Sequence, residues 1–176
     1  MDLDFEVVDL GEPDHPEEGE TAPDFARPLV NDEYWADVSL SELTDDGPVA
    51  LIFYPMDGAF PATYIWNELR DRSVDEYDVT VVGLSISTPY EHKTLIEERG
   101  IEDTDIGLYS DPANGVAAQY GIVNDLDGMT GVSEPRPAAF VLDGGRTVQY
   151  AWAASEWPDF PDYDELEAAI EQAADS

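Results

Sequence analysis

The sequence contains no cysteine, and this absence excludes disulfide bonds, thiolate catalysis and cysteine-ligated metal sites. Imidazoles are scarce too, because His15 and His92 are the two histidines of the chain. A lone histidine is more often a solvated or a core residue than a catalyst, so we expect neither to be catalytic. The acidic residues show no spacing typical of a calcium loop or a zinc site. We therefore expect no metal and no cofactor.

Basic residues are almost missing as well. Lys93 is the single lysine, and 7 Lys and Arg stand against 41 Asp and Glu, which gives a net charge of −34. Such a surface repels nucleic acids and anionic membranes, so we expect neither as a partner. It could recruit a basic partner, or it could be adapted to molar salt, where the Debye length falls to about 3 Å. We favour salt adaptation because acidic residues occur in every segment, and the composition resembles that of haloarchaeal proteins.

Long apolar runs are also lacking. No segment approaches membrane-spanning length, and the opening Met-Asp-Leu-Asp is unlike a basic signal-peptide start. The sequence therefore predicts a cytoplasmic protein in a high-salt cytoplasm. With 176 residues, 43% of them hydrophobic, the chain can bury the core of one domain. We expect an acidic N-terminal extension over residues 1–18 and a single domain over residues 19–176.

The segment 49–71 is the most informative part of the chain. Residues 49–54 form an apolar, β-branched and aromatic run that is typical of a strand buried on both faces. Pro55 ends this strand, and from Pro61 onward Ile65 and Leu69 recur at helical spacing. In α/β proteins chemistry is placed at such junctions, because free N–H groups and the positive end of the helix dipole converge there.

The remaining elements alternate between strand and helix. We expect strands at 79–87 and 106–109, helices opening at 88–89, 116 and 163, a hairpin of 25–29 with 38–43, and a second hairpin of 138–142 with 147–152. The sequence predicts an α/β fold with a mixed central sheet flanked by helices and preceded by a β-hairpin.

Three motifs resemble those of one protein family. The segment 53–63 reads F-Y-P-x-D-x-x-F-x-x-T, residues 19–25 read G-x-x-A-P-D-F, and residues 108–121 read L-x-S-D-P…Y-G. They are similar to segments of the peroxiredoxins, the alkyl hydroperoxide reductase/thiol-specific antioxidant (AhpC/TSA) family. The resemblance covers nearly all of residues 19–174, and it implies the peroxiredoxin variant of the thioredoxin-like fold.

The same resemblance shows which reactive groups are missing. The family motif is Pro-x-x-x-Thr/Ser-x-x-Cys, so counting from Pro55 puts its threonine at Ala59 and its peroxidatic cysteine at Ala62. The second cysteine of some members corresponds to Asn67. The position of the family's arginine holds Pro137, and Arg136 lies one residue earlier, where we expect its side chain on the other face of a strand. We therefore expect no catalytic residue, and cysteine-dependent activity is excluded.

Another residue could in principle take over. Thr63 and Tyr64 carry hydroxyls in the first helical turn, but no histidine lies near them in sequence. We interpret Asp57 as a solvated loop carboxylate rather than a base. Phe60 and Tyr64 are more typical of packing than of a ligand platform. The residues that could line a remaining pocket are Phe60, Pro61, Thr63, Tyr64 and Arg136.

Two functions of different class follow. The favoured one is a peroxiredoxin-like binding or regulatory module without peroxidase activity, whose partner is an unidentified protein or small molecule. The alternative is an enzyme or ligand-binding protein that reuses the helix N-terminus near Pro61, with Arg136, for an anionic or carbonyl ligand. The family resemblance also implies a homodimer, for which Trp35, Trp152 and Trp157 could supply exposed aromatic surface.

Overall fold

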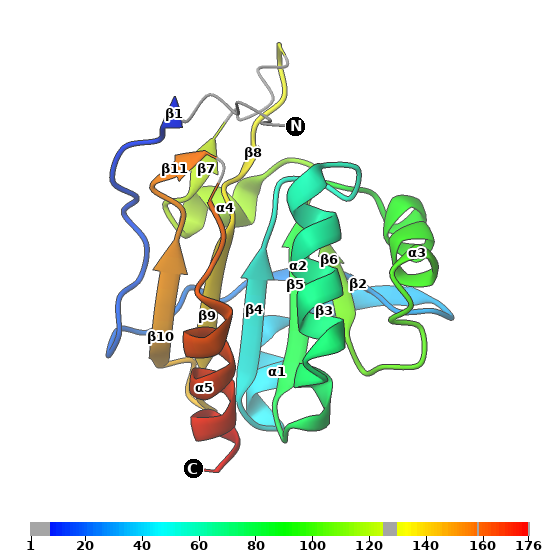
Figure 1. Ribbon diagram of the computed structural model, residues 1–176, viewed down its shortest axis with the longest axis vertical. Coiled ribbons are helices and arrows are strands. Elements are labelled where there is room, and N and C mark those ends of the chain that lie inside the picture. The colour runs from blue at the N-terminus through cyan, green and yellow to red at the C-terminus, as the bar shows by residue number, and fades with distance from the viewer. Residues whose placement is uncertain (1–7, 125–129, 158, 176) are drawn as a thin grey trace, which may run out of the picture.

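A seven-stranded sheet forms the centre of the computed structural model, which describes residues 8–124, 130–157 and 159–175 (Figure 1). The strand order is β10-β9-β4-β5-β6-β2-β3. The bounds are β2 (Ala26–Val30), β3 (Trp35–Ser39), β4 (Val49–Phe53), β5 (Thr80–Ser85), β6 (Gly107–Ser110), β9 (Ala138–Leu142) and β10 (Val148–Ala153). β4, β5 and β6 are parallel, whereas the other neighbouring strands pair antiparallel. The predicted mixed α/β sheet is confirmed.

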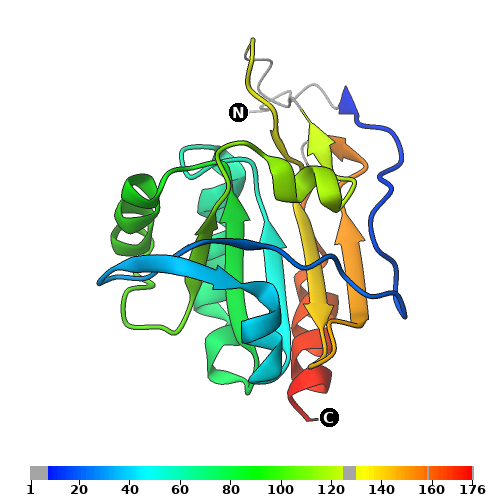
Figure 2. The same ribbon diagram turned by 180° about the vertical axis from the view of Figure 1, so that it is seen from behind.

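Helices cover both faces of this sheet. α2 (Phe60–Asp71), α3 (Pro89–Glu98) and α5 (Tyr163–Ala174) lie on the face seen in Figure 1. α1 (Leu40–Asp45) and α4 (Gly115–Gln119) lie on the opposite face, seen in Figure 2. The remaining short elements are η1 (Val74–Glu76) and the pairs β1 (Val8–Asp9) with β11 (Glu156–Trp157) and β7 (Val123–Asn124) with β8 (Glu134–Pro135).

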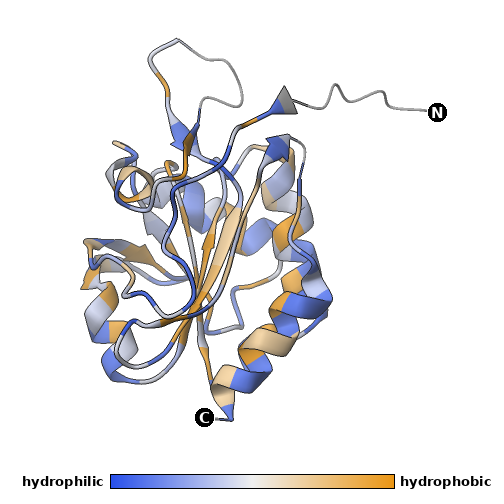
Figure 3. Cartoon of the chain, turned by 90° about the vertical axis from the view of Figure 1, so that its left-hand side faces the viewer, coloured by the Kyte–Doolittle hydropathy of each residue, from blue (hydrophilic) through white to orange (hydrophobic). Residues whose placement is uncertain are grey.

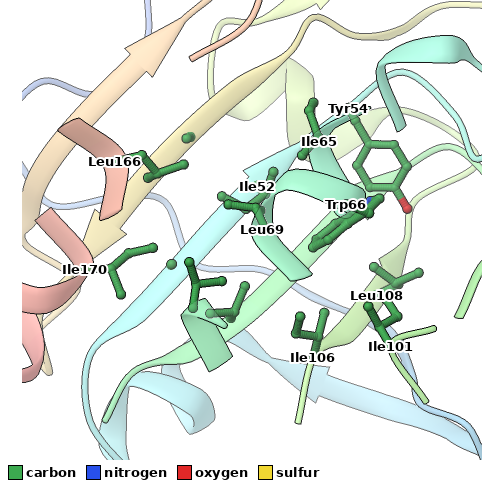
Figure 4. Close-up of a cluster of buried hydrophobic side chains, with 14 of the residues drawn as sticks. Ile52, Tyr54, Ile65, Trp66, Leu69, Ile101, Ile106, Leu108, Leu166 and Ile170 are labelled. Carbon is green, nitrogen blue, oxygen red and sulfur yellow. The ribbon is translucent and has the colours of Figure 1, made fainter. Parts of the chain in front are cut away.

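The central strands supply a core on each side because successive side chains point to opposite faces. In β4, Ala50 and Ile52 join the cluster under α2, α3 and α5, whereas Leu51 and Phe53 join the cluster under α1 and α4. Figure 4 shows the first cluster, in which Trp66 and Leu69 of α2 lie against the sheet. The hydropathy colours of Figure 3 show orange strands between helices whose outer sides are blue. The outcome is a three-layer arrangement with the polar surface outside.

Gly83 of β5 makes the close packing of α2 possible. A Cβ atom at this position would lie 2.3 Å from Cζ2 of Trp66 and 2.8 Å from Cδ2 of Leu108. A glycine therefore lets the buried indole rest directly on the backbone of the central strand.

The segment before β2 covers the β10 edge of the sheet. Gly19 N donates to Val148 O at 2.9 Å, and Val148 N donates to Glu20 O at 2.8 Å. Thr21 forms an isolated antiparallel bridge with Thr147. Figure 1 shows this blue segment running along β10. Of the predicted extension 1–18, the structure describes residues 8–18, and these belong to the same covering segment.

One predicted element is wrong in type. The sequence predicts 38–43 as the second strand of the first hairpin, but β3 ends at Ser39 and α1 begins at Leu40. Ser39 is the N-cap, and its hydroxyl accepts from Glu42 N at 3.2 Å. A serine followed three residues later by a glutamate is a helix-start signal, and here it prevails over the apolar alternation.

In the part of the chain that the structure describes, no helix is both long and apolar enough to span a bilayer.

Candidate functional site

The loop between β4 and α2 lies at the carboxyl end of a central parallel strand. Ala59 is the N-cap of α2, with φ −78° and ψ 146°, and it makes no side-chain cap hydrogen bond. Pro61 sits in the first turn, as the sequence predicts. An alanine in place of Ser or Thr at an N-cap typically lowers helix stability by about 1 kcal/mol. The N-cap position therefore has no side chain that can cap the helix and no hydroxyl that can bind a ligand.

Ala62, where a nucleophile would stand, is sealed inside the protein. Its relative exposure is 0%, and it belongs to the core cluster with Tyr54, Ile65 and Trp66. A methyl group has no lone pair, and no solvent reaches this one. A molecule in solution can thus meet neither a nucleophile nor an open site at this position.

Aromatic side chains cover the outer side of the helix start. The Phe60 ring lies 5.2 Å from the Trp157 ring and 6.3 Å from the Phe160 ring, and Tyr64 lies 5.9 Å from Phe160 (centroid distances). Phe60 therefore packs, as the sequence interpretation has it, in edge-to-face contacts that stabilise the junction of α2 with the segment after β11. Tyr64 is exposed, Thr63 is half-buried, and Asn67 one turn later is half-buried.

Arg136 is turned toward the N-terminal segment. Its guanidinium donates to the carbonyls of Ala154 at 2.9 Å, Gly11 at 3.0 Å and Leu10 at 3.1 Å. The side chain is buried, and this burial lowers the pKa of the guanidinium. The backbone carbonyls thus take three donors of the guanidinium, whereas its Nε is buried without a hydrogen-bond partner. Pro137 follows directly, and its carbonyl accepts from Ala154 N at 2.9 Å.

The interpretation of Asp57 as a solvated carboxylate is wrong. Its side chain is 7% exposed, and Oδ2 lies 2.8 Å from Nδ1 of His92, which is fully buried on α3. Tyr54 Oη donates to Asp57 Oδ1 at 2.7 Å, and Asp57 N donates to the Ser87 hydroxyl at 2.8 Å. Tyr54 and His92 thus hold the carboxylate and Ser87 holds the backbone of the same residue, as expected because polar groups inside a protein are stable when they are paired.

The Tyr54–Asp57–His92 triad places the histidine ring between a carbonyl and a carboxylate. Nε2 of His92 lies 2.9 Å from Tyr109 O, and a carbonyl can only accept, so Nε2–H is the donor of this bond. Nδ1 lies within hydrogen-bonding distance of both carboxylate oxygens of Asp57, at 2.8 and 3.0 Å. Burial, and then the Asp57 carboxylate, raise the pKa of the Tyr54 phenol well above its ordinary value.

Asp57 is the one member of the triad that reaches a cavity, and its two partners are closed off from solvent. Tyr54 and His92 are both fully buried, so neither can exchange a proton with a molecule bound at the surface. A cavity of about 220 Å³ adjoins the loop, and its lining residues are Asp57, Gly58, Glu91, Thr94, Leu95 and Glu98. Its carboxylates make it a poor place for an anion. Within the described ranges, no cluster of three or more His, Asp or Glu is arranged to hold a metal ion.

Sequence patterns assign Ala62 to the cysteine position by motif counting, but they miss the triad. Asp57 and His92 are 35 residues apart and share no motif. A sequence signal for their proximity does exist. Asp57 lies in the loop after β4 and His92 lies in α3, the helix after β5, and these two parallel strands are neighbours.

Comparisons with known proteins agree on one family. A model of the AhpC/TSA family matches residues 19–151. A protein named as a peroxiredoxin in Mycobacterium tuberculosis (strain ATCC 25618 / H37Rv) is 33% identical over 131 residues, which cover 74% of this chain and 80% of that protein. The peroxiredoxin ycf42 of Pyropia yezoensis is 28% identical over 139 residues, which cover 76% of this chain and 66% of the relative. The matched segment thus spans about two thirds of that relative's length.

Solved structures show the same fold. The crystal structure of the peroxidoxin BcpB from Mycobacterium tuberculosis matches with a TM-score of 0.73 and 27% identity, covering 90% of this chain and 98% of that chain. The reduced 2-Cys peroxiredoxin of Plasmodium vivax matches with a TM-score of 0.72 over 88% of this chain and 80% of that chain. At 22% identity, this second match speaks to the fold alone.

Proposed function

Because this chain belongs to the AhpC/TSA family and yet contains no cysteine, we propose that it is a member without peroxidase activity that acts as a binding or regulatory module. The observation that carries the proposal is the absence of cysteine, together with the burial of Ala62, the residue at which the family motif, counted from Pro55, has its peroxidatic cysteine. Fold similarity alone would suggest an oxidoreductase, but function depends on the site.

The family's catalytic groups other than the cysteine are also missing from this chain. The reaction implied by the family begins when a thiolate attacks a peroxide oxygen, with a threonine hydroxyl and an arginine holding the oxygens in line. Here Ala59 has no hydroxyl, and the guanidinium of Arg136 donates to backbone carbonyls instead. Three chemical roles are thus missing together, which favours a chain that no longer turns over peroxide.

A peroxide-consumption assay tests this proposal. The chain is incubated in molar KCl with hydrogen peroxide or an organic hydroperoxide, using dithiothreitol or thioredoxin with its reductase as electron source. We expect no rate above buffer, whereas a cysteine-containing peroxiredoxin that is active in the same buffer shows that the assay works. Turnover that persists in the presence of a metal chelator would refute the proposal.

The alternative, an anionic or carbonyl ligand at the helix start near Pro61, has less support. The cavity beside the loop carries Glu91 and Glu98, and Arg136 is engaged elsewhere. A thermal-shift screen in high salt with phosphate, nucleotides and organic acids distinguishes this ligand site from a module that binds a protein. A ligand that raises the melting temperature would favour this alternative over a protein-binding module.

We further propose a high-salt cytoplasm and a homodimer as the setting of this protein. The net charge of −34 supports the first, and the family membership supports the second. Sedimentation velocity in molar KCl measures whether the dimer forms.

A further inference from the structure

Among the residues that the structure describes, none pairs with the outer side of the outermost strand β3. β3 ends the strand order of the central sheet and pairs with β2 on its inner side. Trp35, Ala36 and Asp37, the first three residues of this strand, are exposed. An open edge offers unpaired N–H and C=O groups, which are a template for a further strand.

The hydrogen-bond register shows which residues offer these groups. Asn31 N donates to Tyr34 O at 3.1 Å, and β2 pairs Leu29 with Ala36 and Arg27 with Val38. In an antiparallel pair, hydrogen-bonded positions alternate with positions whose backbone groups point outward. Tyr34, Ala36 and Val38 therefore bond to β2. The backbone N–H and C=O of Trp35 and Asp37 point to the open side.

An aromatic surface adjoins this edge on the side of α3. Trp35 lies 5.2 Å from Tyr90 (ring centroids), and Lys93 Nζ lies 5.7 Å from the Trp35 ring centre. The relative exposures are 61% for Tyr34, 37% for Trp35 and 73% for Tyr90. These are three of the five large hydrophobic side chains that are exposed in the described part of the chain. Figure 1 shows α3 beside the tip of the β2–β3 hairpin.

A groove of about 530 Å³ lies on the other face of β3. Its apolar lining comes from the hairpin, α1, β5 and the start of β6, namely Leu29, Val38, Leu43, Val82 and Ile106. Asp32, Glu33 and Asp105 add carboxylates to the lining. A strand added along β3 would alternate its side chains between this groove and the Trp35–Tyr90 surface.

We propose that β3 is a docking strand for an extended basic segment of a partner protein, which adds to the sheet as an eighth strand. Lysine or arginine side chains of the segment would lie near the exposed Tyr90 ring and the Asp37 carboxylate, beside the Trp35 ring over which Lys93 lies. Aliphatic side chains at the alternate positions would enter the groove. The segment that fits thus alternates cationic and aliphatic residues.

Charge at the edge itself is the reason to choose a basic partner over a second copy of this chain. If β3 paired with β3 of a second copy, Asp32, Glu33 and Asp37 of one copy would lie close to those of the other, and an acidic peptide would meet the same carboxylates. The homodimer proposed above therefore uses another surface. Lys93 illustrates the chemistry, because the sole lysine of the chain already lies over Trp35 and donates to Glu33 O at 3.1 Å. The surface is separate from the loop around Ala62, so this inference and the peroxide assay can fail independently.

Binding of a designed peptide tests the proposal. The probe is a fluorescein-labelled peptide of alternating lysine and valine, with a glutamate–valine peptide as its charge control. We expect the lysine–valine peptide to bind, the glutamate–valine peptide not to bind, and NMR shifts to concentrate at Trp35, Asp37 and Tyr90. Trp35→Ala is expected to weaken binding at least tenfold, whereas Val123→Ala, at an exposed position on β7, changes it less than twofold.

Two further arms test backbone pairing and salt dependence. The variant Asp37→Pro removes a backbone N–H of β3 that points outward and does not bond to β2. A peptide N-methylated at alternate residues removes the N–H donors of the peptide instead, while the protein stays unchanged. Each is expected to reduce binding at least tenfold. Binding should persist in 2 M KCl, because backbone hydrogen bonds and apolar burial are not screened.

Three outcomes would overturn the inference. The first is binding that survives both Trp35→Ala and the N-methylated probe. The second is an interaction that vanishes entirely in 2 M KCl, which would mean charge attraction alone. The third is a dimer of this chain that forms through β3 and is abolished by Asp37→Pro, which would make a second copy the occupant.

Discussion

The residue that most constrains the loop before α2 is His92. Its Nε2–H is used by the Tyr109 carbonyl, so its other nitrogen is directed at Asp57. In the His92–Asp57 pair, the imidazole ring lies 2.8 Å from a carboxylate that is only 7% exposed to solvent. Such a pair adds little stability compared with an apolar replacement of both partners, but removal of one partner leaves a buried charge unpaired.

We predict that His92→Leu lowers the free energy of unfolding by about 3 kcal/mol, because Asp57 and the Tyr109 carbonyl lose their donor. Urea unfolding in 2 M KCl, followed by tryptophan fluorescence, measures this change. Glu97→Gln, at an exposed position of the same helix, is the matched control and is expected to change stability by less than about 0.5 kcal/mol. A His92→Leu variant as stable as this control would mean that the pair does not hold the loop.

At the scale of elements, Arg136 joins the N-terminal segment to the end of β10. It donates to Leu10 and Gly11 before the sheet and to Ala154 after β10. Other contacts of the segment are Leu10 N to Ser155 O at 3.0 Å, Asp14 N to Gly121 O at 3.3 Å and the β1–β11 pair. One guanidinium therefore connects parts of the chain that are more than 120 residues apart.

We predict that Arg136→Met releases this segment while leaving the central sheet intact, because methionine fills a similar space without donating hydrogen bonds. Hydrogen exchange read by NMR should be at least tenfold faster at Leu10, whose amide bonds to Ser155 O, and unchanged in β4. Arg70→Met, which removes a donor to Arg99 O on another part of the surface, should leave the exchange of Leu10 unaltered. Unchanged protection at Leu10 in Arg136→Met would mean that the backbone contacts of the segment hold it without the guanidinium.

The elements also show what sequence patterns can and cannot predict. The strand at 49–53 and the helix after Pro61 were predictable, because buried β-branched runs and helical spacing act locally. α1 was missed because Val38 and Leu40 alternate like a strand, while the Ser39 cap decides the structure. The vacancy at Ala62 follows from motif counting alone. The partners of Asp57 and Arg136 come from distant segments, and no local pattern encodes such contacts.

At the scale of the whole molecule, buried tyrosines lie in both layers of the core. Tyr54 belongs to the cluster under α2, and Tyr109 and Tyr120 belong to the cluster under α4. Burial raises the pKa of each of these phenols, and it raises the pKa of Tyr150 to about 12. The folded chain therefore keeps protons that the unfolded chain loses as the pH rises through about 10.

We predict that stability is fully present below about pH 10 and falls above it, because the unfolded state then binds fewer protons than the native state. Three phenols that ionise only on unfolding give a slope of up to about 4 kcal/mol per pH unit. Urea titrations between pH 8 and 11.5, with phenolate absorbance recorded in parallel, measure this slope. Tyr54→Phe should reduce it by about 1.4 kcal/mol per pH unit. A stability that stays constant up to pH 11.5 would contradict the prediction.

The two edges of the sheet differ, and the difference limits how the molecule can assemble. In the described part of the chain, residues 19–21 pair with Thr147 and Val148 at the start of β10, whereas the outer side of β3 has no such partner. Growth of a fibril requires two complementary free edges on every subunit, so that each addition creates a place for the next. Because the start of β10 is already paired, this asymmetry favours addition of a single strand at β3 over continued growth through both edges.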